Sequence, residues 1–243
     1  MDLLSDRLTA VQDQISAAAA RAGRSVEDVT LVAVSKTHSP EEIEEALQAG
    51  QFLFGESRVQ EAKAKIPLLP GRARWHFIGH LQRNKIRHAL GLGIELFHGI
   101  DSLETARDLD RIAAEGGLHP RLLLEVNVAG ESSKFGFSAK TIRAQMEELL
   151  AFDRLQIEGV MTIAPFATEA ESSRPHFVAL RELRDALQSE FRLPLPQISM
   201  GMSGDYTVAV EEGATLVRVG TAIFGTRRGK AWKPQSESAS FED

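Results

Sequence analysis

Short apolar segments alternate with longer amphipathic segments along most of the chain. The apolar segments are rich in β-branched and aromatic residues, which favour strands, and they span residues 30–35, 52–57, 75–80, 95–100, 121–128, 156–164, 197–201 and 215–225. The segments between them have the apolar spacing of helices, and in one of these the stripe consists of Leu180, Leu183, Leu187 and Phe191. The pattern therefore predicts strands and helices in alternation.

Two helices have particularly clear signals. Apolar residues at spacings of three and four predict an extra helix before the first strand; they are Leu4, Leu8, Val11, Ile15, Ala18 and Ala22. After the first strand, Ser39 is placed as an N-cap, and Pro40 follows in the first turn. Glu42 completes a capping box and Gly50 is the expected stop.

The alternation predicts the α/β fold class. A chain of 243 residues with eight strand–helix units is close to the length of about 250 residues typical of a (β/α)8 barrel. We therefore expect a single TIM barrel with the extra N-terminal helix, and a doubly wound open sheet is the alternative. No strong linker divides the chain, so residues 1–228 are expected to form one domain, followed by a polar tail over residues 229–243.

Composition narrows the function classes. The formal net charge of −6 disfavours a sequence-blind nucleic-acid binder, which needs a basic face. The absence of cysteine excludes disulfides and thiolate chemistry and fits a reducing compartment. The sequence has no apolar run near the ~20 residues of a membrane span, and its N-terminus lacks the order of a signal peptide. We therefore expect a cytoplasmic protein that binds neither nucleic acid nor a membrane.

Lys36 lies at the end of the first predicted strand, where barrels carry their functional side chains. A lysine at this position can extend its amine into water. Alternatively, a desolvated amine beside another cation is nucleophilic and condenses with an aldehyde to a Schiff base. The first strand alone does not decide between the two.

Two segments near the C-terminus have the residues of a phosphate site. After the seventh strand, Gly201, Ser203 and Gly204 precede a helix, and after the eighth strand come Gly220 and Thr221. Glycines allow close backbone approach, a hydroxyl donates, and a helix N-terminus favours an anion. Barrels commonly bind phosphate at these two loops, although Gly and Ser are also common in ordinary turns.

Arg218 lies within the apolar eighth strand, where an unpaired guanidinium would be costly to bury. A salt bridge to Glu125 or Glu158 would satisfy it, and so would an acceptor atom on a ligand. If the barrel closes, Arg218 lies on the strand next to that of Lys36. An aldehyde with a phosphate and a ring nitrogen would then satisfy lysine, hydroxyls and arginine together, and pyridoxal 5′-phosphate (PLP) has these three groups.

Five segments resemble the pyridoxal phosphate homeostasis protein family, formerly described as the proline synthase co-transcribed protein. They are LVAVSKTHSPEEIEEALQAG, FGESRVQEAKAK, WHFIGHLQRNK, GVMTIAP and ISMGMSGDYTVAVEEGATLVRVGTAIFGTR, in family order over nearly the whole chain. The resemblance implies an alanine-racemase-type barrel that acts in intracellular vitamin B6 homeostasis. It also implies that Lys36 carries the cofactor as an aldimine and that Arg218 faces the pyridine nitrogen. The phosphate cradle that it implies consists of Ser203, Gly204, Gly220 and Thr221.

The chain departs from the family pattern in two places. The family often has Asn-Tyr after FGE, where this chain has Ser57 and Arg58. Ser57 is shorter than Asn and would need a water to reach the ring oxygen of the cofactor. Around Lys134, in a loop that bears glycine in the family, Phe135 and Phe137 vary the sequence; a solvated lysine is the simpler interpretation there.

The residues favour binding over strong catalysis. An arginine that donates to the ring nitrogen keeps it unprotonated, and a neutral pyridine is a poor electron sink. The chain has a single tyrosine, Tyr206, which is expected to pack; His76, His80 and His98 fall near strand ends and are expected to be structural. No metal-ligand motif is present.

The favoured hypothesis is a monomeric carrier or buffer of PLP, with transient transfer to PLP-requiring apoenzymes. The alternatives are an amino-acid racemase that uses the same aldimine and an aldolase-like enzyme that uses Lys36 on a phosphorylated sugar.

Overall fold

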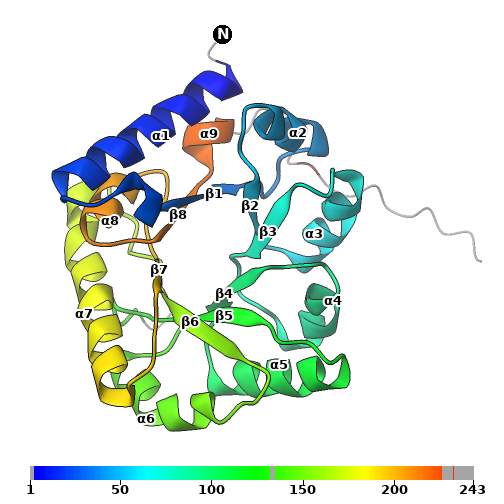
Figure 1. Cartoon of the computed structure of the whole chain (residues 1–243), viewed down its shortest axis with the longest axis vertical. Helices are drawn as coiled ribbons and strands as arrows, with labels where there is room; N and C mark the ends of the chain where they lie inside the picture. The colour runs from blue at the N-terminus through cyan, green and yellow to red at the C-terminus, as the bar shows by residue number, and fades with distance from the viewer. Residues whose placement is uncertain (1–2, 132–134, 226–231, 233–243) are drawn as a thin grey trace, which may run out of the picture.

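The computed structural model describes residues 3–131, 135–225 and 232. Eight parallel strands close into a barrel in sequence order (Figure 1). The strands are β1 (Thr30–Val34), β2 (Leu53–Glu56), β3 (Arg74–Phe77), β4 (Leu96–Ile100), β5 (Arg121–Glu125), β6 (Gln156–Met161), β7 (Gln197–Ser199) and β8 (Leu216–Val219). Because β8 pairs with both β7 and β1, the sheet is closed. The predicted barrel is confirmed.

Helices follow the strands and surround the barrel (Figure 1). The α-helices are α1 (Leu4–Arg21), α2 (Pro40–Gln48), α3 (Val59–Lys65), α4 (Ile86–Leu90), α5 (Leu103–Glu115), α6 (Ala139–Leu150), α7 (Arg174–Phe191), α8 (Tyr206–Glu211) and α9 (Thr221–Phe224). Single 3-10 turns are η1 (Val26–Asp28), η2 (Ile66–Leu68), η3 (Arg83–Lys85) and η4 (Ala170–Ser173). Among the described residues, no helix is long and apolar enough to cross a membrane.

The sequence signals of the first two helices are largely correct. Ser39 caps α2: its hydroxyl accepts from the Glu42 N–H, and the Glu42 carboxylate accepts from the Ser39 N–H. The apolar stripe of α1 is buried from Leu4 to Ala18. Its last predicted member, Ala22, is instead the exposed C-cap, and Ala19 is buried in its place. The helix ends at Arg21, so Ala22 lies outside it and does not extend the apolar stripe.

The segment 215–225 differs from its prediction as one long strand. β8 ends at Val219, and residues 221–224 form the short helix α9. The hydroxyl of Ser203 accepts hydrogen bonds from the N–H groups of Gly220 at 3.1 Å and Ala222 at 3.4 Å. A hydroxyl from the loop after β7 thus accepts from two N–H groups at the start of α9.

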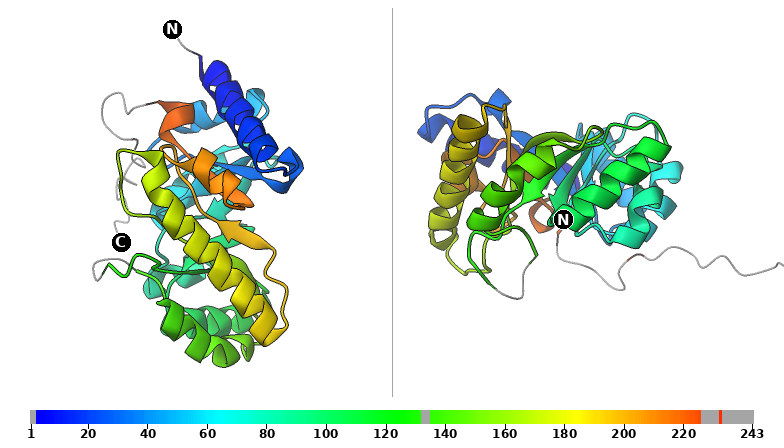
Figure 2. Two further views of the ribbon diagram at one scale, coloured as in Figure 1. Left: turned by 90° about the vertical axis from the view of Figure 1, so that its left-hand side faces the viewer. Right: turned by 90° about the horizontal axis from the view of Figure 1, so that it is seen from below.

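The N-terminal helix α1 packs against α2, α8 and α9, outside the first and last strands (Figures 1 and 2). Because α9 is a single turn, α1 supplies the helical cover that the outer ring needs at this position. The Arg7 side chain of α1 donates to the Ile223 carbonyl oxygen of α9 at 2.6 Å, and Arg24 donates to the Val210 carbonyl oxygen at 2.6 Å. Polar contacts thus join α1 and the residues that directly follow it to the last two helices.

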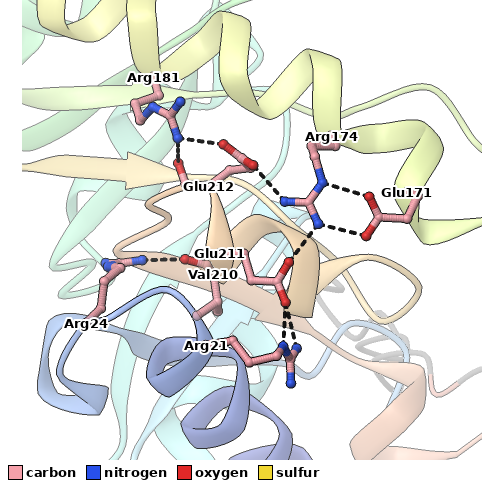
Figure 3. A network of polar contacts seen from close by, with 8 residues as sticks. All are labelled: Arg21, Arg24, Glu171, Arg174, Arg181, Val210, Glu211 and Glu212. Carbon is pink, nitrogen blue, oxygen red and sulfur yellow. Dashed lines mark hydrogen bonds and ion pairs between the residues drawn. The ribbon is translucent and has the colours of Figure 1, made fainter.

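An ion-pair network centred on Arg174 joins α1, α7 and α8 (Figure 3). Its guanidinium contacts Glu171 at 2.7 Å and both Glu211 and Glu212 at 2.6 Å. Glu211 also pairs with Arg21 of α1 at 2.7 Å. A network is worth more than isolated surface pairs, and this one secures α8, which follows the loop that carries Ser203.

Two layers fill the barrel interior. The layer farther from the carboxyl ends of the strands is apolar and consists of Val32, Leu53, Leu96, Leu123, Met161 and Leu216. Since side chains alternate along a strand, residues two positions later face the same interior nearer the carboxyl ends of the strands. On three of the six strands those positions hold the buried polar residues His98, Glu125 and Arg218. On the other three strands they hold Val34, Gly55 and Ile163. Polar side chains of β4, β5 and β8 therefore lie between the apolar layer and the mouth of the barrel.

Gly159 of β6 provides a test of how closely the strands pack. A Cβ at this position would lie 1.8 Å from the Gln197 carbonyl oxygen of β7, so Gly159→Ala must push the two backbones apart. We expect this substitution to lower the free energy of unfolding, measured by urea denaturation, by about 1–3 kcal/mol. The matched control is Gly71→Ala, where no atom lies within 4 Å of the added Cβ. Equal stabilities of the two variants would contradict the packing.

Candidate functional site

A cavity of about 290 Å³ opens at the carboxyl ends of the strands. Its walls come from the ends of β1, β2, β3 and β8 and from the loops after β6 and β7. All seven site residues predicted from the sequence line it: Lys36, Ser57, Ser203, Gly204, Arg218, Gly220 and Thr221. The closed barrel thus brings residues from both ends of the chain to one cavity.

Lys36 lies two residues beyond the end of β1 and lines the cavity. Val32 faces the barrel interior, Val34 and Lys36 line the cavity, and Ser35 points to the opposite side, toward the helices. Lys36 is exposed, so its amine reaches both the cavity and solvent. A second cavity of about 340 Å³ shares Val34, Lys36, Gly220 and Thr221 with the first.

Ser203 lies at the centre of the predicted phosphate corner. Its oxygen accepts from the N–H groups of Gly220 and Ala222, which leaves its own hydrogen free to donate to a ligand. The backbone approaches closely here, because a Cβ on Gly220 would lie 3.2 Å from Val34 Cβ. Gly204 faces open space, with no atom within 4 Å of an added Cβ. The free hydroxyl hydrogen of Ser203 thus borders a space that an anion can enter.

The loop that bears Ser203 is held by Asp205, which the sequence analysis did not identify. One carboxylate oxygen of Asp205 accepts from the Met202 N–H at 2.7 Å, and the other accepts from the Ser173 hydroxyl at 2.8 Å. The left-handed Gly201, with φ 87°, begins this loop. The signal for Asp205 was its place four residues after that glycine, directly before α8.

Arg218 is 4% exposed, and its bonds differ from the salt bridge considered above. It donates to the Ser199 hydroxyl and, at 2.8 Å, to the Thr162 carbonyl oxygen. Glu158 is paired instead with Arg121. Burial lowers the pKa of Arg218 to about 10, against the opposing effect of Glu125 and Asp205, so the guanidinium stays charged at neutral pH. Neutral partners leave that charge available to a ligand.

A buried hydrogen-bond chain extends from Arg218 across the barrel. Ser199 Oγ lies 2.9 Å from His98 Nδ1, and His98 Nε2 lies 3.0 Å from His76 Nδ1. Burial lowers the pKa of His76 to about 4 and that of His98 well below its ordinary value, so both imidazoles are neutral. Since Arg218 only donates, the Ser199 hydroxyl hydrogen can point to His98. These two histidines support Arg218 and do not line the cavity.

His80 and Tyr206, also considered from the sequence, do not line the cavity. His80 pairs with Asp101 at 2.7 Å and stacks on Phe135, away from the cavity. The Tyr206 hydroxyl donates to Gln14 of α1 at 2.7 Å, which is the packing role expected for it. Lys134 lies outside the described residues. Burial, with Asp101 nearby, raises the pKa of Glu125 to about 7, against attraction from Arg218 and His80.

The apolar wall of the cavity was also missed from the sequence. It is formed largely by the loop after β6, and the lining residues are Ile78, Ile163, Pro165, Phe166, Ala167, Ala170 and Met202. The segment GVMTIAP indicated this loop, but its residues carry no reactive group and so gave no chemical signal.

The donor set fits a flat, phosphorylated aldehyde. An amine, hydroxyl groups and a buried guanidinium line one cavity with an apolar wall, as small-molecule sites generally have. Among the described residues, no group of three or more His, Asp or Glu side chains could hold a metal ion.

Comparisons with known proteins agree with this geometry. The family model of the alanine racemase N-terminal domain matches residues 7–228. The chain is 41% identical to the pyridoxal phosphate homeostasis protein of Aquifex aeolicus over 224 residues, which cover 92% of this chain and 98% of that protein.

Solved structures agree as well. PipY of Synechococcus elongatus PCC7942 without PLP has a TM-score of 0.82 at 39% identity, over 91% of this chain and 100% of that chain. The same protein with PLP bound has a TM-score of 0.79 at 38% identity, over 91% and 100%. The chain therefore belongs to the pyridoxal phosphate homeostasis protein family, whose barrel is that of the alanine racemase N-terminal domain.

Proposed function

We propose that the chain binds pyridoxal 5′-phosphate and holds it reversibly on Lys36, as a carrier or buffer of this reactive aldehyde in vitamin B6 homeostasis. The observation that carries the proposal is the convergence of Lys36, Arg218 and the Ser203 corner on one cavity. The name of the relatives and the PLP-bound structure of PipY support the same ligand.

The proposed attachment needs only an amine and an aldehyde. Lys36 Nζ attacks the aldehyde carbon, a C=N bond forms, and the aldehyde oxygen leaves as water. Ser203 and Thr221 would donate to the phosphate, Gly204 and Gly220 would let it approach the backbone closely, and Arg218 would donate to the ring nitrogen. Ser57 lines the cavity and is proposed to reach the ring oxygen through a water.

Weak catalysis follows from the charge of Arg218. A guanidinium that stays protonated keeps the ring nitrogen unprotonated, so the ring withdraws electrons poorly. Glu125, with its pKa near 7, is the group that would favour a racemase, but it does not line the cavity. A racemisation assay separates the two functions: a rate well above that of free PLP would overturn the carrier proposal.

The proposal concerns a small molecule in the cytoplasm and requires no nucleic acid, membrane or second subunit. A carrier must release its cargo, so PLP-requiring apoenzymes are the proposed transient partners. The direct test is an absorbance spectrum of the purified chain with PLP, followed by borohydride reduction and peptide mapping. A modified peptide that contains Lys36 is the expected result.

Lys36→Ala should abolish the visible absorbance band and the borohydride-trapped peptide. The fold should persist, since an exposed strand-end lysine contributes little to the core. Lys63→Ala, at an exposed lysine of α3, is the matched control and should keep the band. A band retained in Lys36→Ala would assign the Schiff base to another lysine.

Arg218→Ala should weaken PLP binding by about tenfold or more, because a hydrogen bond to a charged group is worth about 1.5–3 kcal/mol. Equilibrium dialysis measures the affinity, and circular dichroism checks the fold, since Arg218 also bonds Ser199 and Thr162. Arg121→Ala, at the start of β5, is the control. Unchanged affinity would refute the ring-nitrogen role.

Ser203→Ala should weaken binding of PLP by about 5- to 10-fold, the effect of one lost hydrogen bond. Binding of pyridoxal, which lacks the phosphate, should change much less. The two affinities, measured side by side, separate a phosphate contact from general damage to the loop. Equal losses for both ligands would contradict the role of Ser203 in phosphate binding.

A further inference from the structure

A buried ion cluster lies on the other side of β1 from the cavity. Lys65, the last residue of α3, is fully buried, and its Nζ lies 3.0 Å from Glu56 Oε1 and 2.5 Å from Glu61 Oε1. Glu56 is fully buried as well, and Glu61 is 6% exposed. We call Lys65, Glu56 and Glu61 the buried triad. Glu56 lies between Gly55 and Ser57, so strand alternation turns it away from the cavity that Ser57 lines.

The buried triad binds both residues that flank Lys36. Lys65 Nζ donates to the Ser35 carbonyl oxygen at 2.8 Å, and the Ser35 hydroxyl donates to Glu56 Oε1 at 2.8 Å. On the other flank, the Thr37 N–H donates to Glu61 Oε1. These bonds leave the Lys36 side chain itself unengaged.

Residues 35–38 form a turn whose backbone conformation is unfavourable for Thr37. The His38 N–H donates to the Ser35 carbonyl oxygen at 3.1 Å, which closes the turn 35–38. Thr37, the third residue, has φ 69°. Turns with positive φ at this position normally use Gly or Asn, and a β-branched residue there is an outlier. Such a conformation persists only where its surroundings impose it.

Trp232 adds a contact from the other end of the chain. Its backbone N–H donates to the Thr37 carbonyl oxygen at 3.0 Å, and its ring centroid lies 5.1 Å from Lys65 Nζ. Both backbone polar groups of Thr37 are therefore held, the N–H by Glu61 and the carbonyl by Trp232. This double attachment explains how the turn is maintained.

Stability alone gives little reason for such a triad. Taking charges out of water offsets most of what a buried ion pair contributes. Glu56 Oε2 is buried and has no hydrogen-bond partner within the described part of the chain. The triad is better explained by the geometry that it imposes on its neighbours.

We propose that Lys65, Glu56 and Glu61 are positioning residues that fix the turn 35–38 and so direct the Lys36 amine at the aldehyde of PLP. This inference rests on the proposed function, in which Lys36 holds PLP. It predicts that the triad affects PLP binding only through Lys36.

A double-mutant cycle tests this dependence. Glu61→Leu removes the acceptor of the Thr37 N–H, whereas Glu61→Gln keeps an acceptor oxygen at nearly the same place. PLP affinity is measured by equilibrium dialysis for both variants, each with Lys36 present and with Lys36→Ala. We expect Glu61→Leu to weaken binding about tenfold with Lys36 present, since misdirected reacting groups are costly, and to have little effect in Lys36→Ala. Glu61→Gln should restore most of the affinity.

A control and a second variant complete the design. Glu158→Leu breaks an ion pair at the start of β6, at the opposite end of the barrel, and should leave PLP affinity unchanged. If Glu61→Leu does not fold, Lys65→Met, which removes the bond to the Ser35 carbonyl, takes its place in the cycle.

The outcomes are distinct. An equal loss of affinity with and without Lys36, or no loss at all, would overturn the positioning role. If the unsubstituted protein forms no trapped adduct at Lys36, the proposed function fails before the cycle is reached.

Discussion

The pairing of β1 with β8 is the contact on which the site depends. Val32 is in register with Arg218, and the next interior positions, Val34 and Gly220, meet at the mouth of the barrel. Without this closure, Lys36 and the Ser203 corner would lie at opposite edges of an open sheet. Backbone hydrogen bonds between the first and last strands thus bring the Lys36 amine and the Ser203 corner to one cavity.

The interior of the barrel is organised to keep a charged group buried without neutralising it. Arg218 lies one step above an apolar layer and is bonded by a hydroxyl and a carbonyl oxygen instead of a carboxylate. Neutral His98 and His76 continue the hydrogen-bond chain from Arg218 across the barrel. The protein thereby keeps one cationic face directed at the mouth, where the ligand is proposed to bind.

Most of the fold, but only part of the candidate site, was predictable from the sequence. Apolar periodicity and the Ser39 cap identified the elements, because these signals are local. Lys36, Ser203 and Arg218 were identifiable because they are reactive or polar residues in unexpected places. The apolar wall around Phe166, the cap that Ser203 places on α9 and the buried triad were not, since each depends on contacts between distant segments. Glu56, Glu61 and Lys65 look like ordinary surface charges until the barrel buries them.

The contacts between the first and last elements of the barrel have a consequence for folding kinetics. β1 and α1 are synthesised first, but their partners β8, α8 and α9 come last. Contacts of such long sequence separation form slowly, because the loop-closure entropy must be overcome before they contribute. During synthesis, Lys36 therefore stays without its neighbours from β8 and α9 until the C-terminal part of the barrel has been made.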